Sequence, residues 1–279
     1  MLEILKAVLF GIVEGITEWL PISSTGHMIL LNEFVIMNVS QEFWDMFLVV
    51  IQLGAILAVV LLYWNKIWPF RKKKPGKSMV KKSIITLWIK IIVACIPAAI
   101  VGVLFDDVLD ALFYNYTCVS IALIVFGIAF IFIENWNKGK TPKIISLKEL
   151  DYRTVMLIGV FQLIAAIFPG TSRSGATIVG ALLLGVSRTV AAEFTFFLAI
   201  PVMFGASLLK IVKFAVSGIA ISGMEVIILL VGMLVAFLVS VFVIRFLMGY
   251  IKKHDFKVFG WYRIVLGILV LVYFFTREI

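Results

Sequence analysis

The sequence predicts an all-α integral membrane protein, and three observations lead to that fold class. The 279-residue chain is 63% hydrophobic, its mean hydropathy is +1.14, and only 15% of its residues are charged. An ordinary soluble domain has about 25% charged residues. The chain also contains six long apolar runs and two shorter apolar segments that Pro, Gly and polar residues interrupt. Together these features predict a bundle of membrane-spanning helices with two broken elements.

The six long runs are each sufficient to cross a bilayer, which requires about 20 apolar residues per helix. They lie at residues 43–64, 84–104, 114–135, 190–211, 223–247 and 259–276. No stretch has the composition of a separate soluble domain, so residues 1–279 are expected to form a single membrane domain. Cys95 and Cys118 lie in or beside apolar runs, and neither a disulfide nor a cysteine metal site is expected.

The two interrupted segments are predicted to form re-entrant helix hairpins, at residues 1–37 and 153–186. The stretches "WLPISS" and "FPGTSRS" break them. Broken helices at membrane depth are tolerated only where the backbone lines a cavity enclosed by protein. Each hairpin is followed by three full spans, so the predicted fold has six full spans plus two hairpins.

The distribution of basic residues predicts the orientation of the chain. If the loops at 65–83 and 136–153 are cytoplasmic, 18 of the 25 Lys and Arg residues lie inside and four lie outside. Both termini and the loop "FDDVLDALF" (105–113) are then extracytoplasmic. The net charge of +9 is explained by this topology. No nucleic acid partner is expected.

The chain also contains an internal repeat. A shift of 148 residues aligns "FGIVEGITEWLPISSTG" with "IGVFQLIAAIFPGTSRS", and the matched pairs are Gly11 with Gly159, Glu14 with Gln162, Pro21 with Pro169, and Ser24 with Ser172. The halves lie at about 1–135 and 153–276, joined by a cytoplasmic linker at about 136–152. Because each half makes an odd number of crossings, the second enters the membrane from the opposite side. This inverted topology predicts a site near the midplane, where the two hairpin turns meet.

Two glutamates, Glu14 and Glu18, are four residues apart and therefore lie on one face of a helix. Carboxylates inside a bilayer are costly and usually functional. The pair could hold a divalent cation, Mg²⁺ or Ca²⁺, through its oxygens, or it could position a proton or a nucleophile. A packing role for two protonated or hydrogen-bonded glutamates is the non-functional alternative.

The stretch "PISSTGH" follows these glutamates directly. Pro21 ends the first half-helix, and Ser23, Ser24 or Thr25 can cap the next one, whose free N–H groups favour an anion. His27 follows one turn later and is predicted to act as a general acid or base near a serine and two carboxylates. Simple capping, and a histidine that only packs, are the alternatives.

The second turn, "PGTSRSGAT" at 169–177, adds an arginine to the same pattern. Arg173 at a helix start is a fork-shaped donor suited to phosphate. Hydroxyl groups surround it in sequence, and they belong to Thr171, Ser172, Ser174 and Thr177. Acids, a nucleophile, an imidazole and an anion clamp are the parts needed for phosphoryl transfer to water.

At this point the chain resembles a known family. "EGITEWLPISSTGHMIL" and "PGTSRSGAT", with "VIQLGAILAVV" and "EFTFFLAIPVMFGAS", resemble the undecaprenyl pyrophosphate phosphatases, the bacitracin-resistance family. The resemblance implies hydrolysis of the C55 carrier pyrophosphate to the monophosphate in the bacterial plasma membrane, with a divalent cation and a site opening outward. It also implies residue roles: the acidic motif is Glu14 and Glu18, the proposed nucleophile Ser24, the acid–base partner His27, and the phosphate-binding motif Ser172, Arg173 and Thr177.

Two rival functions follow from the same features. A polyprenyl-phosphate transporter or flippase would use Glu14 and Glu18 as ion or proton sites. A phosphatase with a histidine nucleophile needs a second histidine after the arginine, and the only other one, His254, lies in a cytoplasmic loop, which excludes that type. The expected partners are a polyprenyl pyrophosphate lipid and the bilayer, with homodimerisation left open. Lys90 and Arg263 are expected to snorkel from span ends to the cytoplasmic surface.

Overall fold

The computed structural model describes residues 1–70 and 79–278, and this part of the chain contains ten helices and no sheet. The helices are α1 (Leu2–Thr17), α2 (Ser24–Phe34), α3 (Gln41–Ile67), α4 (Lys82–Phe113), α5 (Tyr116–Trp136), α6 (Tyr152–Ile167), α7 (Arg173–Leu183), α8 (Arg188–Val216), α9 (Gly223–Tyr250) and α10 (Lys257–Glu278). The predicted all-α fold class is confirmed. The predicted basic loop at 65–83 falls partly on residues 71–78, which lie outside the described residues.

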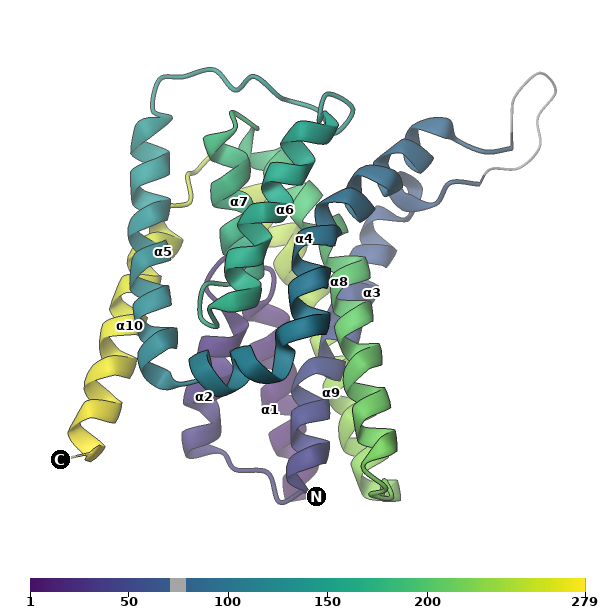
Figure 1. The fold of residues 1–279 in the computed structure, drawn as a ribbon, viewed down its shortest axis with the longest axis vertical. Coiled ribbons are helices and arrows are strands. Elements are labelled where there is room, and N and C mark those ends of the chain that lie inside the picture. Colours follow the sequence, from purple (N-terminus) through teal and green to yellow (C-terminus); the bar gives the residue numbers. More distant parts are fainter. Residues whose placement is uncertain (71–78, 279) are drawn as a thin grey trace.

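Six helices are long and apolar enough to cross a membrane: α3, α4 as far as Phe105, α5, α8, α9 and α10. They coincide with the six predicted spans, which are therefore confirmed. The predicted outer loop "FDDVLDALF" is wrong, because residues 105–113 continue α4 as helix. No Pro or Gly interrupts this stretch, and three aspartates alone do not end a helix. These last turns of α4 bend and run toward the start of α5 (Figure 1).

The predicted hairpins are also present. α1 and α2 form the first, and α6 and α7 form the second. They come from opposite ends of the bundle, and their turns lie at its mid-height (Figure 1). Both chain termini lie at one end of the molecule, and the α5–α6 connection lies at the other. This arrangement brings the two polar turns into the centre of an otherwise apolar bundle.

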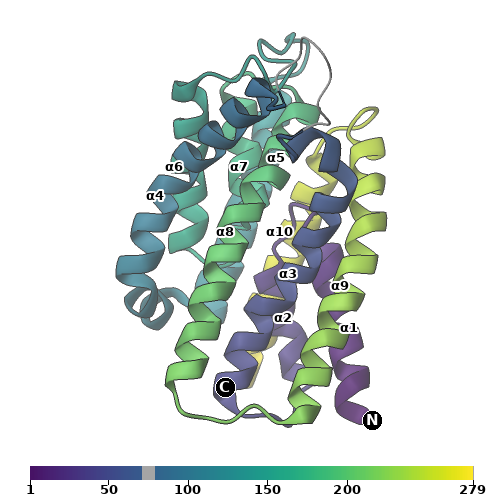
Figure 2. The same ribbon diagram turned by 90° about the vertical axis from the view of Figure 1, so that its right-hand side faces the viewer.

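The helices that enclose the turns come from both halves of the chain. α1 packs on α9, α6 on α4, and α5 on α10. α8 lies between α3 and α4 (Figure 2). If each helix of the first half is matched with its counterpart in the second, α1 corresponds to α6 and α4 to α9, so the α1–α9 contact corresponds to the α4–α6 contact. The inverted repeat itself stays a prediction.

Small residues let α10 approach α5 closely. A Cβ atom on Gly127 of α5 would lie 2.7 Å from the carbonyl oxygen of Gly260, and one on Gly260 would lie 2.7 Å from that of Gly127. Such glycine contacts allow the backbones of membrane helices to pack directly against each other. This packing brings the first two turns of α10 against the two hairpin turns.

Candidate active site

The turns before α2 and α7 have the same local structure. Ser23 has a φ of 73° and Ser172 a φ of 69°, and they are the only non-glycine residues with positive φ in the described chain. The Ser23 hydroxyl accepts a hydrogen bond from Gly26 N at 3.3 Å, and the Ser172 hydroxyl accepts one from Gly175 N at 3.2 Å. Both serines are therefore N-caps in a strained conformation of a kind that clusters at functional sites.

The positions of these two N-caps show that the predicted alignment of the two halves is wrong by one residue at the turns. The sequence comparison paired Ser24 with Ser172, but the structural equivalent of Ser172 is Ser23. The reason is that the second turn is one residue longer, since its cap stands three residues after Pro169 whereas Ser23 stands two after Pro21. The residues that begin the two helices are therefore Ser24 in α2 and Arg173 in α7.

The Glu18 side chain joins the two turns. Its Oε2 accepts a hydrogen bond from the Ser24 hydroxyl at 2.7 Å, and its Oε1 lies 3.0 Å from Nη2 of Arg173. The Ser174 hydroxyl donates to the Glu18 backbone carbonyl at 3.3 Å. Glu18 is buried at the end of α1. The predicted convergence of the two turns is confirmed, because one carboxylate touches residues from both.

Arg173 extends from the first position of α7 toward α8. Its Nη1 donates to the Thr195 carbonyl at 3.0 Å, so the guanidinium is held from two sides. The side chain is 13% exposed, which leaves it accessible to a ligand. A planar guanidinium fixed in this way can offer two parallel donors to a phosphate.

Glu14 lies one helical turn before Glu18 and is buried, and among the described residues its Oε1 has no hydrogen-bond partner. The same is true of both amide atoms of Gln162 and of the Thr171 hydroxyl. An unsatisfied buried polar atom costs about 1–3 kcal/mol. These groups therefore favour a ligand that would complete their hydrogen bonds.

A divalent cation fits this donor set in part. Glu14 offers a free carboxylate oxygen, whereas both oxygens of Glu18 already have partners. In the described part of the chain, no three His, Cys, Asp or Glu residues come together. Mg²⁺ is commonly held by one or two carboxylates together with substrate phosphates and water. The site therefore suits a cation that arrives with a phosphorylated substrate.

His27 is not hydrogen-bonded to Ser24, contrary to the predicted serine–histidine pair. Its Nδ1 lies 2.7 Å from the Ser23 carbonyl oxygen, and its Nε2 lies 2.7 Å from the Tyr262 hydroxyl. The two rings are parallel, with centroids 5.6 Å apart. The imidazole thus faces α10, while the Ser24 hydroxyl faces Glu18.

The remaining predicted hydroxyls take different positions. Ser172 and Ser174 lie 3.1 Å apart through their Oγ atoms, beside Arg173. Thr25 is partly exposed. Thr177 is fully buried, donates to the Arg173 carbonyl at 2.9 Å and pairs with the Thr195 hydroxyl at 2.8 Å. The Thr177 hydroxyl therefore links the first turn of α7 to α8.

Sequence reasoning missed the contribution of Arg263 in α10. Its expected snorkelling is wrong, because the side chain is fully buried. The guanidinium donates to the carbonyls of Pro21 at 3.1 Å, Gly170 at 2.9 Å and Thr171 at 2.8 Å, so it ties both turns together. It also reaches carbonyls of α5, those of Leu123 and Ala122. An arginine inside a predicted span is the signal that could have indicated this role.

An apolar cavity begins at Arg173. It has a volume of about 670 Å³ and is lined by Arg173, Gln162 and residues 95–103 of α4, 165–166 of α6 and 201–212 of α8. Most of these lining residues are Ala, Val, Leu or Gly, and the exceptions are the polar Arg173 and Gln162 together with Cys95 and Pro201. Such a cavity suits an apolar chain that carries an anionic head.

The fold and this site define a class of protein: an integral membrane protein in which a buried glutamate–arginine pair lies beside an apolar cavity. The family described as "Bacitracin resistance protein BacA" matches residues 7–269. The chain belongs to this family.

Named relatives cover nearly the whole chain. It is 67% identical to an undecaprenyl-diphosphatase of Desulfitobacterium hafniense over 279 residues, which is 100% of this chain and 99% of the relative. It is 68% identical to undecaprenyl-diphosphatase 1 of Clostridium acetobutylicum, over 98% of each chain. An undecaprenyl-diphosphatase of Enterococcus faecalis is 60% identical over 97% of each chain.

Proposed function

We propose that this chain is an integral membrane phosphatase that hydrolyses undecaprenyl diphosphate to undecaprenyl phosphate and inorganic phosphate. The observation that carries the proposal is the Glu18 carboxylate, which contacts both the Ser24 hydroxyl and the Arg173 guanidinium. The names of the relatives support this activity. Such an enzyme would recycle the lipid carrier for cell-wall synthesis and confer bacitracin resistance.

The contacts suggest how these residues would act. Arg173 would transfer its donors from Glu18 to the terminal phosphate and stabilise the charge that develops there. Glu18, released from Arg173, would accept the proton of the attacking hydroxyl, which belongs either to Ser24 or to a water that Ser24 orients. The bond between the terminal phosphorus and the bridging oxygen breaks, and the bridging oxygen leaves with undecaprenyl phosphate. If Ser24 attacks, a second hydrolytic step releases the phosphate.

A divalent cation, Mg²⁺ or Ca²⁺, is part of the proposal. Glu14, with the oxygen that lacks a partner among the described residues, and Glu18 would hold it together with substrate oxygens. When bound, it would offset the negative charge of the diphosphate. The apolar cavity beside Arg173 would receive the first part of the polyprenyl chain.

The placement in the cell is also proposed. We infer a multi-pass protein of the bacterial plasma membrane, with both termini and the opening of the site on the extracytoplasmic side. The positive-inside distribution supports this orientation, and it requires both termini to lie at one end of the molecule, as they do in Figure 1. The inverted repeat and a homodimer stay predictions.

Release of inorganic phosphate from undecaprenyl diphosphate by the purified protein tests the function. We expect turnover that a chelator stops and added Mg²⁺ or Ca²⁺ restores. A polyprenyl-phosphate transporter would release no phosphate. Glu18→Gln is expected to lower turnover at least about 100-fold at every cation concentration, because it weakens the contacts to both Ser24 and Arg173.

Glu14→Gln tests the cation site separately. Removal of one charged oxygen ligand should raise the cation concentration needed for half-maximal activity, with turnover recovering at saturation. Glu42→Gln, on an exposed turn of α3, is the matched control and should leave the titration unchanged. Wild-type behaviour in Glu14→Gln would exclude the cation role, and wild-type behaviour in both Glu14→Gln and Glu18→Gln would refute the proposed mechanism.

A further inference from the structure

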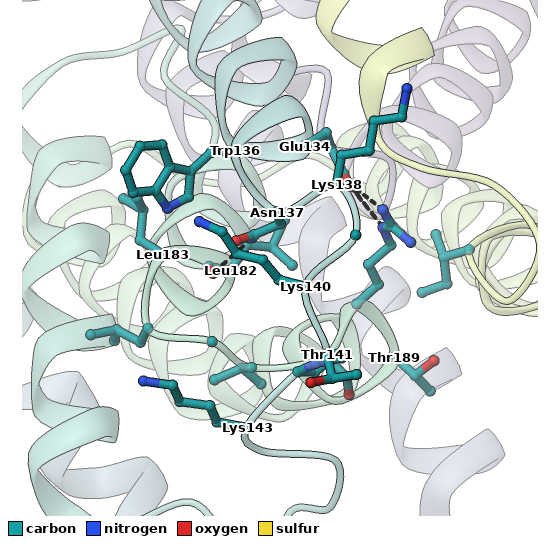
Figure 3. Close-up of a pocket in the computed structure, with 18 of the residues that line it drawn as sticks. Glu134, Trp136, Asn137, Lys138, Lys140, Thr141, Lys143, Leu182, Leu183 and Thr189 are labelled. Carbon is teal, nitrogen blue, oxygen red and sulfur yellow. Dashed lines mark hydrogen bonds and ion pairs between the residues drawn. The ribbon is translucent and has the colours of Figure 1, made fainter.

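A second cavity, drawn in Figure 3, lies at the end of the bundle opposite to the termini (Figure 1). Its volume is about 930 Å³. Its walls are the end of α5 with the following residues 136–143, the α7–α8 turn at 182–189, and residues 251–252 after α9. None of the residues placed in the candidate active site lines it.

The cavity has an excess of positive charge. Its lining includes five cationic side chains, those of Lys138, Lys140, Lys143, Arg188 and Lys252, and one carboxylate, that of Glu134. The Glu134 carboxylate is buried and forms an ion pair with Arg188. The Arg188 Nε lies 2.8 Å and 3.1 Å from the two carboxylate oxygens, and Nη2 also contacts the carboxylate. In the described part of the chain, none of the four lysines has an ion-pair partner.

The walls of the cavity are held together by backbone and amide hydrogen bonds. Lys143 N donates to the Gly185 carbonyl at 2.8 Å, and Ser187 N donates to the Ile144 carbonyl at 2.9 Å. The Asn137 side chain donates to the Leu182 carbonyl at 3.0 Å. The segment after α5 is thus fixed to the α7–α8 turn, and the lysines project from a preformed frame.

Exposed apolar groups border the same cavity. The Trp136 side chain is 58% exposed and Leu183 is 46% exposed. Lys140 Nζ lies 3.9 Å from the centre of the Trp136 ring, and the Lys143 side chain lies across the opening from Lys140 (Figure 3). Exposed tryptophan beside lysine is typical of the boundary between acyl chains and headgroups. The positive-inside rule explains basic residues at this end but not their arrangement around one framed cavity with an aromatic border.

We infer that this cavity binds a phosphate-bearing anion. Lysines supply the charge, and Thr141 and Thr189 in its lining carry further hydroxyl donors. Basic pockets between membrane helices are known to bind anionic headgroups. The phosphate would come from the headgroup of an anionic phospholipid, with Trp136 beside its glycerol region, or from free phosphate in solution. This binding does not depend on the phosphatase activity.

Native mass spectrometry of the full-length, delipidated protein can test the inference. The protein is titrated with phosphatidylglycerol and with phosphatidylcholine of identical chains. We expect phosphatidylglycerol to bind more tightly, and Lys140→Gln/Lys143→Gln to weaken its binding by about tenfold to thirtyfold, since each lysine contributes about 1 kcal/mol. The matched control, Lys148→Gln/Lys253→Gln, removes two lysines of the same loops that do not line the cavity and should bind as the wild type does.

A second arm identifies the source of the phosphate. Millimolar inorganic phosphate is added to the phosphatidylglycerol complex. Displacement of the lipid, or direct phosphate binding that the cavity variant loses, supports a soluble ligand at the same site, whereas no displacement supports the headgroup. Phosphate release in detergent should be unchanged in both double variants, and this activity also shows that they fold. If the cavity double variant does not fold, the single variant Lys143→Gln is used in its place. Equal affinity for the two lipids without phosphate binding, or equal losses in the cavity and control variants, overturns the inference.

Discussion

The turn before α2 and the turn before α7 have the same backbone and different chemistry. Each is capped by a serine with positive φ whose hydroxyl accepts a hydrogen bond from a glycine N–H three residues later. The next residue is Ser24 in the first turn and Arg173 in the second. The first turn therefore presents a hydroxyl and the second a guanidinium, and Glu18 contacts both.

The difference shows how one repeated backbone can form a two-sided site. A second hydroxyl in place of Arg173 would leave the site without a cation from α7, and a second arginine in place of Ser24 would remove the hydroxyl that donates to Glu18 and that we propose attacks the phosphate or orients water. Both turns are held by Arg263, which donates to the carbonyl of Pro21 in one and of Gly170 in the other. The backbone supplies the position, and a single side chain at each helix start supplies the group, a hydroxyl or a guanidinium, that contacts Glu18.

The largest effect is expected from Arg173→Lys, which removes the chemistry of the second turn but keeps its charge. We expect kcat to fall at least about 100-fold, because lysine lacks the planar fork that fits a phosphate. The unfolding transition should change little, and Arg245→Lys, at an exposed position of α9, should behave as the wild type does. If Arg173→Lys keeps most of its phosphate release, the clamp role is wrong.

The shared support of the two turns is tested by Arg263→Lys and Arg263→Met. Loss of a buried guanidinium leaves several carbonyls unsatisfied, so the methionine variant should lose about 3 kcal/mol of unfolding free energy. The lysine variant should recover part of this stability but still have a lower kcat with little change in KM, since the turns lose their relative position. A lysine variant with normal kcat would restrict Arg263 to a structural role.

Tyr262→Phe tests whether the contact between α10 and His27 contributes to the function of the first turn. It removes the hydroxyl that contacts His27 Nε2 and keeps the stacked ring. Loss of one hydrogen bond of about 1 kcal/mol predicts a fall in kcat of about fivefold to tenfold. Trp261→Phe, at an exposed neighbouring position, is the control. An unchanged pH–rate profile and kcat in Tyr262→Phe would show that His27 acts without this contact.

The smallest effects are expected at the two caps. Ser23→Ala and Ser172→Ala should each lower the unfolding free energy by about 1 kcal/mol, whereas the glycine variants should lose only a few tenths. Unfolding in mixed micelles measures both pairs. Clearly unequal losses at the two positions would contradict the equivalence of the two turns.

Much of this architecture could be predicted from the sequence. Apolar length identifies the spans, and Pro21 and Pro169 beside hydroxyl residues mark the broken helices, because lipid tolerates such groups only inside protein. The contacts of Tyr262 and Arg263 could not be predicted in this way, since they depend on which helix packs against which. The exact pairing of the turns was missed because the second contains one more residue, which a fixed shift of 148 cannot accommodate.

The position of Arg263 in the chain also affects how the enzyme is made. The ribosome adds Arg263 92 residues after Thr171 and 242 residues after Pro21. Both turns are therefore synthesised before the guanidinium that holds them exists, and the nascent chain has no finished site while it is threaded into the bilayer. We therefore expect the two turns to be fixed relative to each other only once α10 has docked against α5.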